Sequence, residues 1–123
     1  MKKLLVALLV AGAPLTTAAA MPVSTFLQKA DALQAKGMMA LFSSDYKLLK
    51  GEVERNSAEL RTERLAAKAA GRRPAYCPPE AQGGINSDEL LRAFHTIPAD
   101  KQPRTEVKDA LRALLARKYP CRA

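Results

Sequence analysis

Two cysteines and one histidine are the side chains of this 123-residue chain most suited to covalent or metal chemistry. Cys77 lies in the stretch AYCPPE, Cys121 lies close to the C-terminus, and His95 is the sole histidine. A catalytic cysteine needs a base such as histidine beside it, and a structural zinc ion needs four ligands of these kinds. Two cysteines and one histidine are too few to coordinate a structural zinc ion. If the two cysteines are bonded to each other, neither is free to act as a nucleophilic thiolate. We therefore expect a Cys77–Cys121 disulfide, no metal site and no Cys–His catalytic pair.

The N-terminus indicates the compartment in which this disulfide would form. A short positive region is followed by an apolar run from Leu4 to Leu15 and by the small residues Ala18 to Ala20. This is the pattern of a secretory signal peptide, and the run is shorter than the roughly 20 residues of a membrane-spanning helix. We expect a signal peptide over residues 1–20, cleavage after Ala20, and a bacterial periplasmic protein without a transmembrane segment. Disulfides persist in that oxidising compartment, and this one would be worth about 4 kcal/mol.

No other residues have the spacing of a catalytic or cofactor site. Asp88 and Glu89 are adjacent, but they fall in the first turn of an expected helix, where negative charge is favourable in itself. Gly83 and Gly84 precede that helix without the Lys-Ser/Thr signature of a phosphate-binding loop. We therefore expect a protein that is not an enzyme and that uses no cofactor.

The chain has an excess of positive charge. It contains 20 Lys and Arg against 12 Asp and Glu, which gives a formal net charge of +8, and the signal peptide accounts for only two of the lysines. In an exported protein this excess does not indicate nucleic acid binding. Anionic membranes, the cell wall or an acidic protein partner are the counter-charges that the envelope offers. A solvated basic surface without a specific ligand is the alternative.

The elements that position these residues are expected to be helices. Alanine and leucine are abundant, valine and isoleucine are scarce, and no stretch shows the strict alternation of a strand. We expect an all-α fold in which residues 21–123 form one small domain. Four main helices are predicted, from Ser24 as N-cap to Gly37, from a cap formed by Ser43, Ser44 and Asp45 to about Ala70, from Asn86 to Pro98, and from about Thr105 to Lys118. Asn86 and Glu89 have the spacing of a capping box.

The long central helix has the most regular pattern. Its core-facing stripe follows steps of three and four, with Asn56 in one otherwise apolar position: Phe42, Tyr46, Leu49, Val53, Leu60 and Ala67. The remaining positions carry charges of both signs. The stripe fits packing against its own domain, and it also fits a homodimer formed through this helix.

The segment from Arg72 to Gly84 holds three prolines and two glycines and is predicted to be a loop. It contains Cys77, which precedes the third helix, whereas Cys121 follows the fourth. If these two helices are antiparallel, their outer ends meet, and the disulfide closes a C-terminal helical hairpin over residues 77–121.

The C-terminal half resembles the Rap- and Tai-type immunity proteins, which are small periplasmic helical proteins that neutralise cell-wall amidase effectors of type VI secretion. The residues that carry the resemblance are Cys77-Pro78-Pro79, Leu90, Leu91, Pro98, Ala110, Leu111, Leu114 and Tyr119-Pro120-Cys121. The resemblance implies that the protein occludes the active site of an amidase toxin and performs no chemistry itself. Arg72, Arg73 and Tyr76 are the candidate partner-binding residues, because arginine and aromatic side chains anchor interfaces. The loop from Asp100 to Arg104 is a second candidate surface.

Two other functions fit the same features. A periplasmic acid-stress or general chaperone of the Hde type would also be small, exported, helical and linked by one disulfide. Such a protein needs carboxylates or histidine whose protonation exposes an apolar surface. A basic envelope-associated structural protein would instead bind anionic surfaces through its positive face.

Overall fold

The computed structural model describes residues 20–79 and 84–122. The elements in these ranges are, in chain order, α1 (Val23–Lys36), the 3₁₀ helix η1 (Gly37–Phe42), α2 (Ser44–Ala69), α3 (Ser87–His95), the 3₁₀ helix η2 (Gln102–Arg104) and α4 (Val107–Lys118). The prediction of an all-α fold with four main helices, one of them long, is confirmed. Nearly all of the predicted signal peptide, residues 1–19, lies outside the described residues. No helix in the described ranges combines the length and the hydropathy needed to cross a bilayer.

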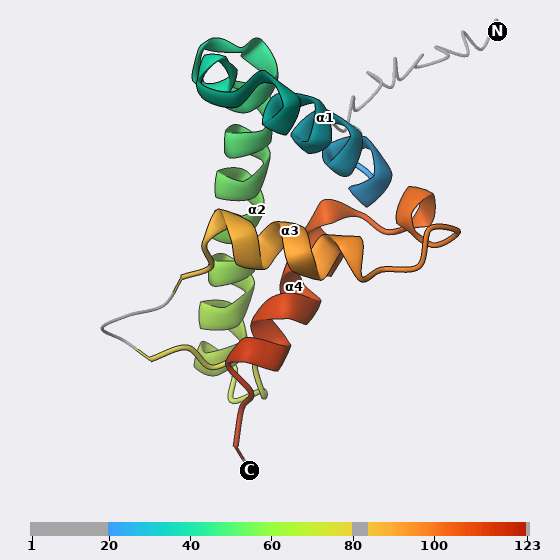
Figure 1. Ribbon diagram of the computed structural model, residues 1–123. Coiled ribbons are helices and arrows are strands. Elements are labelled where there is room, and N and C mark those ends of the chain that lie inside the picture. The colour runs from blue at the N-terminus through green and yellow to red at the C-terminus, as the bar shows by residue number, and fades with distance from the viewer. Residues whose placement is uncertain (1–19, 80–83, 123) are drawn as a thin grey trace, which may run out of the picture.

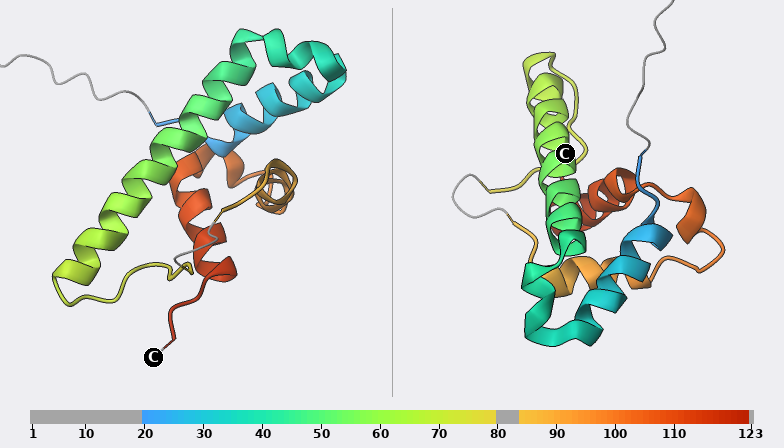
Figure 2. Two further views of the ribbon diagram at one scale, coloured as in Figure 1. Left: turned by 90° about the vertical axis from the view of Figure 1, so that its left-hand side faces the viewer. Right: turned by 90° about the horizontal axis from the view of Figure 1, so that it is seen from above.

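The long helix α2 organises the molecule. It runs along the length of the structure, and α1 folds back beside its N-terminal half (Figure 1; Figure 2, left). The helix α4 packs along α2 further down, while α3 crosses in front of both in Figure 1 and contacts α1 and α4. One core joins all four helices, and its most completely buried side chains are Val23, Leu60, Phe94, Val107 and Leu111. The rings of Phe26 and Phe94 meet edge to face with centroids 5.3 Å apart.

The first helix begins two residues earlier than the sequence predicts. Pro22, not Ser24, occupies the N-cap position of α1, and no side chain caps the helix. The free backbone groups there are used in tertiary contacts instead. The N–H of Val23 donates to the carbonyl oxygen of Thr105 at 2.8 Å, and the N–H of Val107 donates to that of Met21 at 2.9 Å. The start of α1 is thus paired with the start of α4, a contact that local capping rules do not reveal.

The capping box predicted for α3 is only half formed. The side chain of Asn86 accepts a hydrogen bond from the N–H of Glu89 at 2.8 Å, as expected for an N-cap. The carboxylate of Glu89 does not turn back to the cap. It pairs with the ammonium of Lys118 on α4 at 2.8 Å, and this hydrogen bond raises the pKa of Lys118. The partner on another helix is preferred because it offers a full opposite charge.

The core-facing stripe of α2 differs from the prediction at its N-terminal end, whereas Ala67 near its C-terminal end is buried as predicted. Phe42 and Tyr46 are exposed, because the chain turns at η1 and no other described segment covers the corner. Leu49 and Leu60 are buried within their own chain, which is one of the two arrangements that the pattern allowed. Asn56, the polar member of the predicted stripe, is buried, and so is Glu52, which the stripe did not include.

The predicted disulfide between Cys77 and Cys121 is confirmed. It joins residues separated by 44 positions, with their Cα atoms 5.0 Å apart, and it closes the unit that contains α3 and α4. The backbone reinforces the junction, since the N–H of Cys77 donates to the carbonyl oxygen of Tyr119 at 2.8 Å. The loop after α2 is therefore fastened to the end of α4.

Candidate partner-binding site

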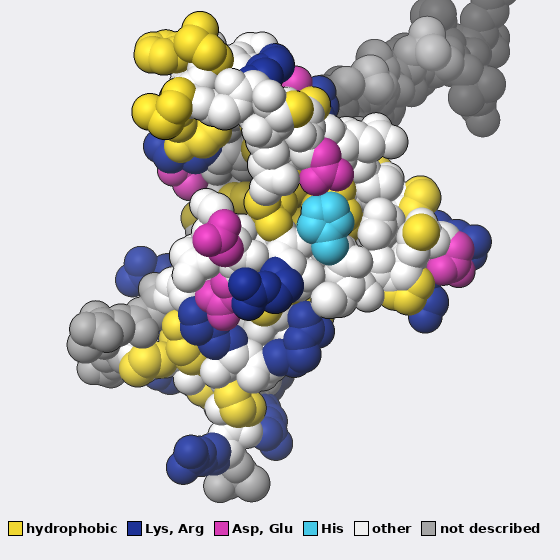
Figure 3. Space-filling view, viewed as in Figure 1, with side chains coloured by type: hydrophobic (Ala, Val, Ile, Leu, Met, Phe, Trp, Pro, Cys, Tyr) yellow, Lys and Arg dark blue, Asp and Glu magenta, His cyan; other side chains and the backbone are white. Residues whose placement is uncertain are grey.

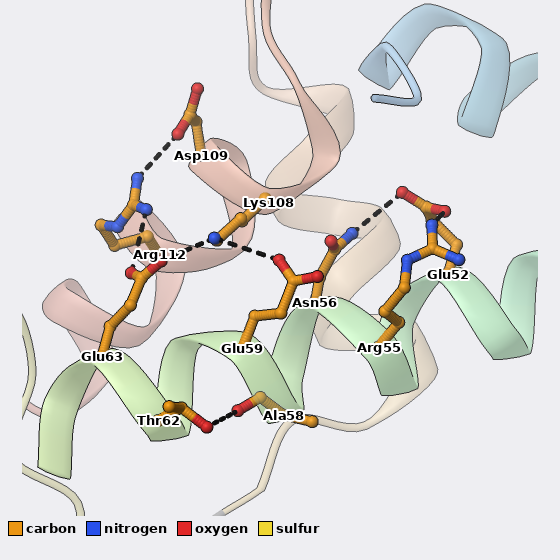
Figure 4. A network of polar contacts seen from close by, with 10 residues as sticks. All are labelled: Glu52, Arg55, Asn56, Ala58, Glu59, Thr62, Glu63, Lys108, Asp109 and Arg112. Atoms are coloured by element: carbon orange, nitrogen blue, oxygen red, sulfur yellow. Dashed lines mark hydrogen bonds and ion pairs between the residues drawn. The ribbon is translucent and has the colours of Figure 1, made fainter. Parts of the chain in front are cut away.

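The two flanks of α2 differ in whether their charged side chains form ion pairs with α4. On one flank, Glu59 and Glu63 face the basic residues of α4 (Figure 4). The ammonium of Lys108 lies 3.1 Å from the carboxylate of Glu59 and 2.6 Å from that of Glu63. The guanidinium of Arg112 reaches Glu63 at 3.3 Å and Asp109 at 2.7 Å. The acidic flank of α2 is thus compensated inside the molecule.

These contacts shift the pKa values of the groups involved. The hydrogen bond from Lys108 lowers the pKa of Glu63 below its ordinary value of 4.5, and the same bond raises the pKa of Lys108 above 10.5. The pKa of Arg112 is raised, chiefly by its hydrogen bond to Asp109. All of these shifts favour the charged forms, so the flank stays ionised and paired at neutral pH.

In the second half of α2, the opposite flank carries only positive charge. Arg61, Arg64 and Lys68 follow one another at helical steps of three and four, and they form no ion pair with the described residues. They line a cleft of about 550 Å³ that we call the basic cleft. Its other walls come from the end of α4 and from the segment after α2 that carries Cys77, which we call the disulfide loop. They include Pro78, Pro79, Leu115 and Tyr119.

The floor of the basic cleft is aromatic. Tyr76 is 5 % exposed, and the guanidinium of Arg64 lies over its ring, 5.5 Å from the centroid. The Nε atom of Arg64 is buried and has no hydrogen-bond partner among residues 20–79 and 84–122. A cation held in place over an aromatic face is suited to an anionic group that enters the cleft.

The structure separates the three residues predicted to bind a partner. Arg72 and Arg73 are exposed where α2 ends, and the guanidinium of Arg73 donates to the carbonyl oxygen of Cys121. Tyr76 is not presented at the surface as a predicted anchor would be. It is buried because Arg64 covers its face and it packs in the core. Its role in the cleft is therefore structural support.

The second candidate surface lies elsewhere. Asp100, Lys101 and Arg104 are exposed in the connection between α3 and α4, which Figure 1 places on the side of the molecule away from the disulfide loop. His95 is also exposed, and its Nε2 atom lies 3.4 Å from a carboxylate oxygen of Asp31 on α1. Neither group contributes to the lining of the basic cleft.

The sequence pattern does not by itself reveal the basic cleft, because its arginines and lysine belong to a helix face of mixed charge. One signal is nevertheless present. Residues 61, 64 and 68 share one flank of the helix, whereas the acidic residues 59 and 63 share the other. The pattern shows that the signs are segregated, but not that the acidic flank is neutralised by α4.

The chemistry available at this site is ionic binding. Within the described residues, no group of three or more His, Cys, Asp or Glu side chains could hold a metal ion. A second hollow of similar volume lies between α1, α2 and α3, with an apolar lining that includes Phe26, Leu33, Leu49 and Leu91. The basic cleft is the stronger candidate, because recognition sites combine an apolar lining with a few convergent polar groups.

Comparison of the chain with protein-family models, with curated proteins and with solved structures found no match.

Proposed function

We propose that this chain is an exported binding protein without catalytic activity, which captures an acidic segment of a protein partner in the basic cleft. The observation that supports this function is the segregation of charge on α2. Arg61, Arg64 and Lys68 line the cleft without an ion-pair partner among the described residues, while Glu59 and Glu63 of the same helix are paired with α4. Arginine binds carboxylates through two parallel hydrogen bonds, so a cleft of this kind favours aspartate and glutamate side chains.

The partner that we propose is an amidase effector of type VI secretion, in keeping with the resemblance of the C-terminal half to Rap- and Tai-type immunity proteins. The effector would place an acidic segment near its substrate groove into the basic cleft. Arg72 and Arg73 extend the positive surface beyond the cleft, at the end of α2. The bound immunity protein would then block access of peptidoglycan to the active site, which requires no reaction of its own.

The walls of the cleft are held in place before any partner binds. The disulfide fixes the loop that carries Tyr76 to the end of α4, and the α2–α4 ion pairs fix the helix that carries the arginines. Preorganisation of this kind lowers the entropic cost of binding. A rigid cleft therefore fits a protein that has to hold its partner firmly.

The test is protection of cells from an amidase directed to the periplasm. A neighbouring gene with a Cys–His amidase signature would supply the toxin, and its expression alone should kill the cells. Co-expression of the present chain should restore growth, and the R61E/K68E variant should fail to do so. Charge reversal at the cleft is expected to weaken binding of the purified amidase by roughly a hundredfold, because it turns two attractions into repulsions.

The matched control is the R92E/R117E variant, which changes the net charge equally. Arg92 and Arg117 are exposed in the last turns of α3 and α4, outside the lining of the cleft. Reversal there opposes the helix dipole, so this control is at least as demanding for stability. Equal protection by the two variants would refute the role of the cleft. Absence of rescue by the folded wild-type chain would refute the immunity function itself.

A further inference from the structure

The corner between α1 and α2 exposes an apolar surface. The exposed fractions of Met38, Met39, Leu41 and Phe42 are 82 %, 68 %, 52 % and 82 %. We call these four residues of η1 the apolar tip. Figure 3 shows the corresponding hydrophobic side chains projecting together from one end of the molecule. A cluster of large apolar side chains on a convex corner contributes nothing to the core, and such patches mark sites of interaction.

The apolar tip is held in a defined position. Gly37 ends α1 with a φ of 58°, which favours glycine, and Ser43 begins α2 as its N-cap. The N–H of Ser43 donates to the carbonyl oxygen of Ala40 at 2.9 Å. Just below the tip, the ammonium of Lys29 on α1 lies 3.1 Å from the carboxylate of Asp45 on α2. The two helices therefore support the tip as one unit.

Lysines surround the apolar tip. Lys36 is the last residue of α1 and Lys47 lies in the first turn of α2, and both are exposed. The nearby carboxylate of Asp45 is paired with Lys29. Figure 3 shows positive side chains on two sides of the projecting apolar atoms. The result is an apolar apex with a positive border.

We propose that the apolar tip inserts into the surface of an anionic lipid bilayer. Methionine, leucine and phenylalanine side chains would enter the boundary between headgroups and acyl chains, while Lys36 and Lys47 would meet the lipid phosphates. This combination of apolar insertion and basic attraction is the general basis of peripheral membrane binding. The proposal rests on the tip alone and does not depend on the partner of the basic cleft.

A second copy of the chain fits the tip less well. A stable protein interface takes about 20–30 residues from each side, whereas this corner supplies four large apolar side chains. Two tips placed face to face would also bring their lysines together, and like charges oppose association. A bilayer accepts a small convex wedge and supplies the opposite charge. The lipid surface is therefore the occupant to which we commit.

Membrane insertion at the tip would also orient the molecule. The tip lies at one end of α2, and the disulfide loop beside the basic cleft lies at the other (Figure 1). A molecule seated on lipid through η1 would hold the basic cleft away from the headgroups. The two surfaces could therefore be occupied at the same time.

The absence of tryptophan from the chain allows a site-specific test. Phe42→Trp introduces one fluorophore at the tip of the full chain, and Leu65→Trp introduces one at an exposed position in the second half of α2. Vesicles of phosphatidylcholine with added phosphatidylglycerol should shift the emission of the Phe42→Trp protein to shorter wavelength. Brominated acyl chains should quench it. The Leu65→Trp protein should show neither change, and vesicles of phosphatidylcholine alone should have a much weaker effect.

The contribution of the lysines is measured with the same fluorophore. Adding K36E/K47E to Phe42→Trp should weaken partitioning onto the phosphatidylglycerol vesicles by roughly tenfold or more, because each lysine near an anionic surface adds to the attraction. The control K101E/R104E makes the same change of charge in the connection between α3 and α4 and should have a smaller effect. An unchanged Phe42→Trp spectrum, or a shift confined to Leu65→Trp, would overturn the proposal. A blue shift that depends on protein concentration without vesicles would assign the tip to a second copy instead.

Discussion

At the scale of single residues, the least expected feature is a carboxylate on the core-facing side of α2. Glu52 is 6 % exposed and Asn56 is 5 % exposed. The side-chain amide of Asn56 donates to the Glu52 carboxylate at 3.0 Å, and the guanidinium of Arg55 donates to its other oxygen. A buried carboxylate is tolerated only when its oxygens have such partners. Asn56 therefore helps to stabilise the buried carboxylate of Glu52.

The first prediction concerns this support. Asn56→Ala removes one donor and leaves a buried carboxylate oxygen without its hydrogen bond, so the free energy of unfolding should fall by about 1–3 kcal/mol. Urea unfolding followed by circular dichroism measures the loss. Glu54→Ala is the control, because its carboxylate is exposed and its pair with Lys50 contributes at most about 1 kcal/mol. If Asn56→Ala costs no more than Glu54→Ala, the amide of Asn56 does not stabilise the buried carboxylate.

The candidate site shows what single residues reveal before a structure is known. Arg72 and Arg73 could be assigned to an exposed loop from their type and from the glycine before them. Tyr76 could not be placed, because an aromatic residue in a proline-rich loop suits either an interface or a core. Its burial depends on the approach of Arg64 from α2, which is a tertiary contact. The type of a residue indicates what it can bind, and its neighbours in space decide whether it does.

At the scale of elements, the ion pairs between α2 and α4 make the packing of these helices sensitive to acid. The pKa of Glu63 is lowered in the folded chain, chiefly by its hydrogen bond from Lys108. The folded state therefore binds fewer protons than the unfolded chain around the ordinary value of 4.5. The stabilisation is present above about pH 4.5 and is lost as the pH falls through the depressed folded pKa.

The prediction that follows uses Glu63→Gln. At neutral pH this variant should be less stable than the wild type by up to about 1 kcal/mol, the range for exposed pairs, since half of the Glu63 side chain is exposed. The difference should shrink as the pH falls below about 4.5 and the wild-type carboxyl becomes protonated and loses its charge. Urea unfolding at neutral pH and at a series of pH values below 4.5 measures it, with Glu54→Gln as the control for an exposed glutamate. A difference that does not change with pH would contradict the ion-pair account.

The ends of most elements follow from local signals in the sequence. Gly37, Ser43 and Asn86 mark helix boundaries because their backbone or side-chain chemistry suits those positions. The start of α1 could not be predicted from these local signals, because its backbone forms hydrogen bonds with the segment at the start of α4. The exposed tip could not be predicted from them either, because Phe42 and Leu49 lie in the same periodic stripe. Periodicity shows which residues share a face, but not where the opposite helix stops covering it.

At the scale of the whole molecule, α2 separates two surfaces of different character. The apolar tip and its lysines lie at one end, and the basic cleft with the disulfide lies at the other (Figure 1). The core lies between them, where all four helices meet. The tip adds no burial to this core, and the disulfide covalently links the loop after α2 to the end of α4.

The last prediction tests that link. The variant C77S/C121S loses a cross-link between residues separated by 44 positions, and the chain-entropy argument puts the loss at about 4 kcal/mol. At roughly 4–8 °C per kcal/mol for a domain of this size, the melting temperature should fall by more than about 10 °C. Replacing both cysteines avoids a free thiol that could pair with another molecule.

Thermal unfolding with and without a reductant supplies the control for this variant. Reductant should lower the melting temperature of the wild type to that of C77S/C121S and should leave the variant unchanged. The variant should also bind the partner of the basic cleft more weakly, because Tyr76 precedes Cys77 and the floor of the cleft is held by this bond. If the double variant melts within a few degrees of the wild type, the helices α3 and α4 are held by packing alone. Packing in the core would then determine the shape of the basic cleft, and the disulfide would contribute little to the basic cleft or to the apolar tip.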